Sequence, residues 1–102
     1  MNPTTPTNEI KTTNSIYVVF GTTGEYSDRI EWVVKAFHTE EQAIEFVTNV
    51  TERKDKAEAP YNVNHYVPYN AIEKVAKEIG DPNYHSDYTG TRYYYESVPL
   101  EE

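Results

Sequence analysis

A short polar segment between two apolar runs carries the side chains of this sequence that are best suited to recognition. In chain order they are two carboxylates, a phenol, a hydroxyl and a guanidinium: Glu25, Tyr26, Ser27, Asp28 and Arg29. A planar guanidinium binds carboxylate or phosphate groups through paired hydrogen bonds, and loops on rigid scaffolds commonly carry recognition residues. We therefore expect this segment to contact a partner. The alternative is local: the serine and aspartate cap the turn, the tyrosine lies over the sheet, and the arginine pairs with Asp28 or Glu31.

The residue types needed for catalysis or metal binding are present, but not in the patterns that these functions use. His65, His85 and Asp87 match no known spacing of metal ligands. None of the serines lies in a nucleophile-elbow sequence, and a carboxylate pair such as Glu25 and Asp28 comes with no recognisable pocket signature for acid–base catalysis. The segment Gly21–Gly24 leads into a strand, whereas a phosphate-binding loop leads into a helix that begins with Lys-Ser/Thr. We expect no enzyme activity, no metal and no cofactor.

Tyrosine is over-used, with 10 residues among 102. It supplies large contact area with a polar tip and is enriched at interfaces, although it also fills small cores. The C-terminal region, residues 72–102, holds seven acids and three bases, so the stacking of single-stranded bases, which needs a basic groove, is disfavoured. We expect protein contacts instead, and a homo-oligomer through the edge of the last strand. The C-terminal residues expected at a protein interface are Tyr84, Asp87, Tyr88, Tyr93 and Tyr95.

A hairpin positions the first of these candidate sites. The apolar run at residues 15–20 is rich in β-branched and aromatic residues, which favours a strand ending at Gly21. In the second run, Ile30–Phe37, alternation places Ile30, Trp32, Val34 and Ala36 on one face and Glu31, Val33, Lys35 and Phe37 on the other. The connection Gly21–Asp28 is longer than a two-residue turn.

The rest of the chain predicts two helices and a third strand. Thr39 and Gln42 form a capping box for a helix over Glu40–Lys54, and Asn70 with Glu73 does the same for a helix over Asn70–Ile79, which Gly80 ends. Residues 63–67 are either a short edge strand or a loop, and residues 91–98 are the last strand. The order β-β-α-α-β predicts a small α+β domain over residues 15–100, with a three- or four-stranded antiparallel sheet and helices on one face.

Composition limits the partners. The net charge of −8 opposes binding to phosphate backbones or anionic lipid surfaces, so we expect no nucleic-acid and no membrane partner. The chain has no cysteine, and no apolar run approaches the roughly 20 residues that span a bilayer. Residues 1–14 are polar and lack the apolar stretch of a signal peptide. We expect them to form a disordered tail.

The hairpin also carries a family resemblance. The sequence Gly21-Thr22-Thr23-Gly24-Glu25-Tyr26-Ser27-Asp28, followed by Glu31-Trp32, resembles a motif of small uncharacterised proteins of bacteriophages and prophages. It covers residues 17–47, and the tyrosine-rich second half has no counterpart. The resemblance implies an accessory protein in the cytoplasm of an infected bacterium and implies no chemistry.

Three functions fit these observations. The first is a non-enzymatic phage accessory protein that uses its acidic, tyrosine-rich surface to bind and inhibit or redirect a host protein, such as a defence or nucleic-acid-processing enzyme; Trp32 is either an anchor there or part of the core. The second is an oligomeric binder of a nucleotide-like molecule, with Arg29 and Arg92 as anion contacts. The third is a structural phage component.

Overall fold

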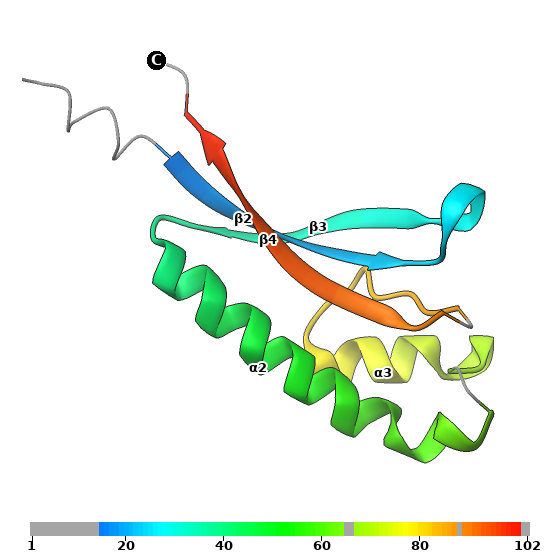
Figure 1. The fold of residues 1–102 in the computed structure, drawn as a ribbon. Coiled ribbons are helices and arrows are strands. Elements are labelled where there is room, and N and C mark those ends of the chain that lie inside the picture. The colour runs from blue at the N-terminus through cyan, green and yellow to red at the C-terminus, as the bar shows by residue number, and fades with distance from the viewer. Residues whose placement is uncertain (1–14, 65–66, 88, 101–102) are drawn as a thin grey trace, which may run out of the picture.

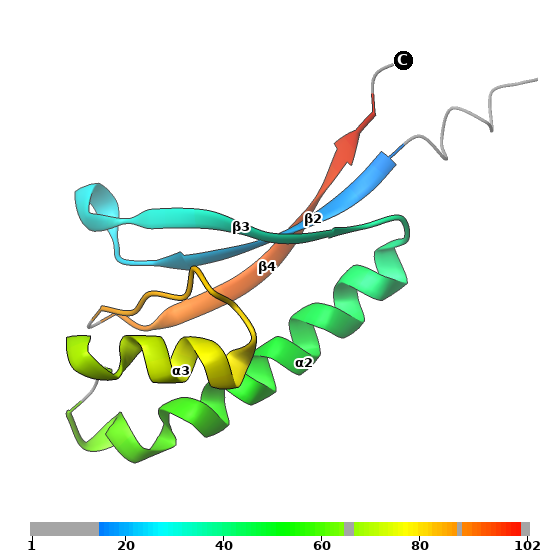
Figure 2. The same cartoon turned by 180° about the vertical axis from the view of Figure 1, so that it is seen from behind.

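The chain folds as an α+β domain with a three-stranded antiparallel sheet, as the sequence predicts. A computed structural model describes residues 15–64, 67–87 and 89–100, so the expected tail at residues 1–14 lies outside the described part. The strands are β2 (Ser15–Thr23), β3 (Ile30–Phe37) and β4 (Thr91–Pro99), in the spatial order β3-β2-β4. The helices α2 (Glu40–Glu58) and α3 (Ile72–Ile79) both lie on one side of the sheet, and the other side is open (Figures 1 and 2).

A bulge in β3 makes the predicted alternation of that strand wrong for its second half. Val19 pairs with Lys35 but Phe20 pairs with Val33, so one residue of β3 is left over between them. Before the bulge the prediction holds, because Glu31 and Val33 face the open side. Beyond it the faces exchange: Lys35 and Phe37 lie on the helix side, where the Lys35 ammonium is 5.8 Å from the centre of the Phe46 ring of α2.

The first helix begins as predicted and ends later. The backbone N–H of Gln42 donates to the Thr39 hydroxyl over 3.2 Å, which confirms the N-terminal cap. The helix continues four residues beyond Lys54 to Glu58, and its buried residues are Ala43, Val50 and Ala57, spaced seven apart on one stripe. Burial of Ala57 against the core therefore extends the helix past the point where the sequence pattern fades.

The second helix is shorter than predicted and lacks the expected cap. A 3-10 turn at Tyr69–Ala71 precedes it, and Ala71 takes the N-cap position without a side-chain hydrogen bond, so the capping box at Asn70 is wrong. Gly80 ends the helix with φ +86°, as predicted. The edge strand considered for residues 63–67 is also wrong at its start, since Ala59–Asn64 is a 3-10 helix.

The core lies between the two helices, the end of β4 nearest to them and the 81–90 loop. Its fully buried members include two tyrosines that we expected at an interface. The core residues are Val50, Ala57, Val67, Ala71, Val75, Ala76, Ile79, Tyr84 and Tyr93. None of the helices in the described residues combines the length and apolar character needed to cross a bilayer.

Candidate functional site

The hairpin tip, residues Gly24–Arg29, is a compact turn built on one glycine. β2 continues to Thr23, so the connection is shorter than predicted. Gly24 has φ +93°, and a Cβ there would lie 2.5 Å from the Asp28 carbonyl oxygen, so only glycine fits. The Asp28 N–H donates to the Glu25 carbonyl over 3.0 Å and the Arg29 N–H to the Tyr26 carbonyl over 3.2 Å. These bonds fix the backbone of the tip.

Tyr26 projects from this turn into solvent. Its side chain is 93% exposed, and its φ of +55° makes it the one non-glycine residue with positive φ in the described part of the chain. The backbone is therefore rigid while the phenol is free. Glu25, Ser27 and Asp28 are exposed as well, and within the described residues no side-chain hydrogen bond or ion pair ties them down.

Arg29 turns back toward the sheet. Its guanidinium lies 2.9 Å from a Glu31 carboxylate oxygen, and its Nε donates to the Thr22 hydroxyl over 3.2 Å. The Tyr94 hydroxyl donates to the same Glu31 carboxylate, and this bond, with Arg29 nearby, lowers the pKa of Glu31. Burial and the Glu31 carboxylate raise the pKa of Tyr94 to about 12. Arg29 thus supports the base of the tip and follows the local alternative that the sequence left open.

The second predicted site, in the 81–90 loop, is bonded into the domain. The carboxylate of Asp87 accepts hydrogen bonds from the Thr89 N–H over 2.8 Å and from the Thr89 hydroxyl over 2.6 Å. The Asp87 N–H donates to the hydroxyl of Thr23, which in turn donates to the Gly90 carbonyl over 2.6 Å. Burial opposes ionisation of Asp87, but the bonds from Thr89 and Thr23 outweigh it and lower the pKa of its carboxyl. Asp87 is therefore a structural residue here.

Two of the predicted interface tyrosines are internal, so we remove them from the candidate surface. The Tyr93 hydroxyl donates to the Asp81 carboxylate over 2.8 Å, and the Tyr84 hydroxyl donates to Glu58 over 2.6 Å. Burial, reinforced by these carboxylates, raises the pKa of both phenols. Tyr95 is half-buried and bonds to Glu40, and Tyr88 lies outside the described residues.

Asp81 is a key residue that the sequence did not reveal. It is 1% exposed, and besides Tyr93 it accepts from the indole N–H of Trp32 over 2.9 Å and from the Asn83 N–H over 3.1 Å. Trp32 lies directly over Gly21, where a Cβ would come within 2.5 Å of the indole. Trp32 is thus an internal packing residue. The only sequence signal for this network was an aspartate at the start of a turn-rich loop.

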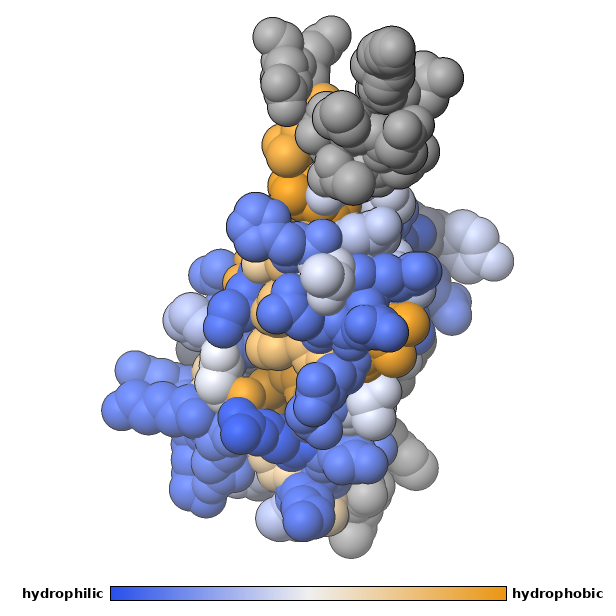
Figure 3. Space-filling model, turned by 90° about the vertical axis from the view of Figure 1, so that its left-hand side faces the viewer, coloured by the Kyte–Doolittle hydropathy of each residue, from blue (hydrophilic) through white to orange (hydrophobic). Residues whose placement is uncertain are grey.

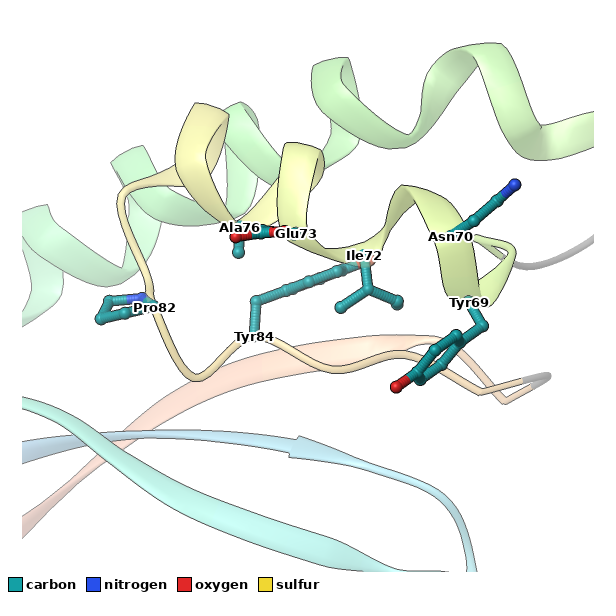
Figure 4. Close-up of a pocket in the computed structure, with 7 residues that line it drawn as sticks. All are labelled: Tyr69, Asn70, Ile72, Glu73, Ala76, Pro82 and Tyr84. Carbon is teal, nitrogen blue, oxygen red and sulfur yellow. The ribbon is translucent and has the colours of Figure 1, made fainter.

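A shallow groove of about 360 Å³ lies between α3 and the 81–90 loop. Figure 4 shows Ile72 on α3 and Tyr69 on the turn before it, with Tyr84 reaching toward α3 from the loop. The groove continues into a second hollow of about 350 Å³ beside Lys77 and Gly80. Its walls are mainly apolar, and Glu73 and Lys77 at its rim carry opposite charges. It therefore holds no converging set of polar groups that would select a ligand.

The sequence also raised two other sites: a metal site, which we did not expect, and an anion site formed by Arg29 and Arg92, which belongs to the alternative function. Within the described residues, no three His, Asp or Glu side chains converge as a metal site requires; His65 lies outside them. Arg29 is engaged by Glu31, and the Arg92 guanidinium points to the Gly24 carbonyl at 3.4 Å, so the two do not form an anion clamp. Comparison with protein-family models, curated proteins and solved structures finds nothing that matches this chain.

Proposed function

We propose that this chain is a non-enzymatic binding protein that inserts its hairpin tip into a basic site of a partner protein. On the resemblance of the hairpin to phage and prophage proteins, the partner is a host bacterial protein that the chain inhibits or redirects. The observation that carries the proposal is the side chain of Tyr26, which is 93% exposed on a fixed turn.

The backbone of Tyr26 argues for selection at this position. A non-glycine residue in the left-handed region costs about 1–2 kcal/mol, and Gly, Asn and Asp tolerate it best. Tyrosine at φ +55° therefore carries strain and gains no packing in return. Strain of this kind clusters at ligand clamps and binding sites, and exposed tyrosine is a common binding hot spot.

The charge of the tip selects the kind of partner. Glu25 and Asp28 flank Tyr26 with exposed carboxylates, and the positive charge of Arg29 is paired with Glu31. The whole chain carries a net charge of −8. Such a surface steers association toward a basic patch and repels phosphate backbones.

The 81–90 loop makes the tip rigid. The Gly24 N–H donates to the Thr89 hydroxyl over 2.8 Å, and Thr23 beside it is bonded to both Asp87 and Gly90. The base of the tip is therefore clamped from the other end of the chain. A pre-formed binding loop loses less conformational entropy when it binds.

The test is to isolate the partner from bacterial lysate with tagged chain, purify it, and measure its affinity for two variants. Tyr26→Ala removes the exposed phenol of the tip, and Tyr69→Ala removes another, 89% exposed phenol before α3. We expect Tyr26→Ala to weaken binding by about 30-fold, as for an interface hot spot, and Tyr69→Ala to leave it unchanged.

A partner that binds Tyr26→Ala as tightly as the natural chain would remove the tip from the interface. The same conclusion holds if the lysate contains no protein that binds the natural chain and fails to bind the Tyr26→Ala variant. A second signature is salt: the association rate should fall steeply as ionic strength rises, because exposed charges steer the encounter.

A further inference from the structure

The side of the sheet away from the helices, which we call the open face, carries apolar side chains from all three strands together with the charged residues Glu31, Arg92 and Glu96. Figures 1 and 2 show no helix over it, and Figure 3 shows apolar surface at the end where β2 begins and β4 ends. Val33 is 57% exposed there. From the strand register, the apolar residues of the open face are Ile16, Val18, Phe20, Val33, Ala36, Tyr94 and Val98.

One aromatic pair lies at the centre of the open face. Phe20 on β2 and Tyr94 on β4 are direct neighbours in the register, and their rings stack with centroids 5.4 Å apart and planes 23° apart. The Tyr94 hydroxyl reaches across to Glu31 on β3. The ring of Tyr94 is therefore fixed on the sheet surface and offers a broad, pre-formed contact.

The order of charged residues along β4 indicates that a second copy of the chain would fit this face. Arg92, Tyr94 and Glu96 are successive open-face residues of β4, with the cation two residues before the tyrosine and the anion two residues after it. If a second β4 runs antiparallel over the first with Tyr94 at the centre, each Arg92 lies opposite the partner copy's Glu96. The pattern is self-complementary, which is what a two-fold interface requires.

We propose that the open face is the site at which two copies of this chain pack sheet against sheet, with Tyr94 near the two-fold axis. Packing of two sheets face to face covers apolar residues on both inner surfaces. The face is only three strands wide, about 15 Å at the usual strand spacing. We expect association through such a small interface to be weak, with a dissociation constant in the micromolar range.

Packing through the face is favoured over pairing at the edge of β4. The Lys54 ammonium from α2 already binds the Thr91 carbonyl over 2.9 Å, which occupies a backbone acceptor at one end of that strand. The Tyr95 hydroxyl binds Glu40 at the other end of α2. The helix thus runs beneath β4, and a second copy of it would compete for the same space in an edge-paired dimer.

In the proposed dimer the two hairpin tips point in opposite directions, because the strands of the two copies run antiparallel. The chain would then be bivalent, with one Tyr26 at each end. This arrangement goes beyond the proposed function and is argued from other residues, since the open face is built from the three strands and residues 24–28 lie outside those strands. A Tyr26→Ala variant should dimerise like the natural chain.

The first experiment is sedimentation equilibrium of the full chain from about 1 µM to about 1 mM, spanning the expected affinity. Val33→Lys places a charge on the open face, and Ile44→Lys makes the same change at a 47% exposed residue of α2. We expect Val33→Lys to raise the dimer dissociation constant at least about 100-fold, because each copy buries an unpaired charge. Ile44→Lys should leave it unchanged.

The second experiment reverses the charges. Arg92→Glu and Glu96→Arg should each weaken the dimer, because like charges then meet twice across the two-fold axis. The double variant should restore the affinity of the dimer. Binding to an unrelated protein would not be restored, because the charges of that protein do not change. Circular dichroism and Tm confirm that each variant is folded.

Three results would overturn the proposal. A chain that stays monomeric to about 1 mM has no such interface. A dimer unaffected by Val33→Lys uses another surface, such as the edge of β4. A double charge reversal that does not recover affinity excludes the antiparallel arrangement around Tyr94.

Discussion

The hairpin tip and the 81–90 loop have similar compositions and opposite roles. Each contains a glycine with positive φ, aspartate and tyrosine, and the sequence indicates partner contact for both. In the structure Asp81 and Tyr84 are almost fully buried, whereas Tyr26 is almost fully exposed. Composition marks both segments as turns, but their place in the fold decides whether their polar groups face water.

The physical reason for the difference is where each loop runs. The tip joins β2 to β3 beyond the last paired residues of the sheet, where water can satisfy the exposed side chains of Glu25, Tyr26 and Asp28. The 81–90 loop joins α3 to β4 and runs between the helix and the sheet (Figure 4). Buried polar groups there need partners within the protein, and Asp81, Asp87 and their donors supply them.

The largest expected effect of breaking this contrast is on Asp81. Asp81→Ala leaves three buried or partly buried donors without an acceptor, those of Trp32, Asn83 and Tyr93. We expect a loss of about 3 kcal/mol or more in the free energy of unfolding, seen as a Tm lower by more than about 12 °C. Asp28→Ala in the tip should change the free energy of unfolding by less than about 0.5 kcal/mol. Equal losses in the two variants would mean that the tip is as firmly built into the domain as the loop.

Two glycines provide the next comparison. Gly24 in the tip and Gly90 in the loop have φ +93° and φ +85°, but a Cβ at Gly24 meets the Asp28 carbonyl at 2.5 Å and one at Gly90 meets nothing within 4 Å. Gly90→Ala should cost only the backbone penalty of about 1 kcal/mol. Gly24→Ala should cost about 2–3 kcal/mol, the penalty plus the strain of moving the turn. Urea unfolding measures the loss of stability in both variants. Only Gly24→Ala should also weaken binding of the partner. Similar costs would show that the tip can rearrange freely.

Asp87 makes the contrast depend on pH. Its folded pKa is lowered, so its contribution to stability is full above the unfolded value of about 3.9 and is lost as pH falls through the folded pKa. Asp87→Asn keeps the shape but weakens the bonds from Thr89, and should cost about 1–2 kcal/mol at pH 7. The difference in the free energy of unfolding between this variant and the natural chain should become smaller by about pH 3. Unfolding curves recorded at pH 7 and pH 3 measure this difference. A gap of constant size would exclude the charge as its source.

The sequence predicts most of the fold because local signals agree with it. Short stretches of neighbouring residues are enough to predict the hairpin, the cap at Thr39, the end of α3 at Gly80 and the last strand. The bulge in β3 and the extra turn of α2 do not, because they depend on how that strand and helix meet the rest of the domain. A register shift between Val19 and Phe20 has no marker in the composition of either strand.

The candidate site was predictable in part for the same reason. Residues 25–28 stand out because a polar run between two strands must be a turn. The separation of the tyrosines into internal and exposed ones was not predictable, since the strand Thr91–Pro99 alternates between two faces and tyrosine suits both. Tyr93 found a buried carboxylate 12 residues earlier, at Asp81, and that contact exists only once α3 and the loop have folded back onto the sheet.

The smallest effect is the most specific to the tip. Tyr26→Asn places a residue that tolerates positive φ at a position where tyrosine is strained. We expect the free energy of unfolding to rise by about 0.5 kcal/mol while affinity for the partner falls, measured by thermal unfolding and by titration of the purified partner. Tyr69→Asn, at an exposed position of ordinary backbone geometry, should lower stability slightly or not at all and leave binding intact. Opposite signs for stability and binding at one residue indicate that tyrosine is retained there for its contact with another molecule, because folding alone would favour its replacement. A Tyr26→Asn variant that loses stability would show instead that the phenol helps to hold the turn.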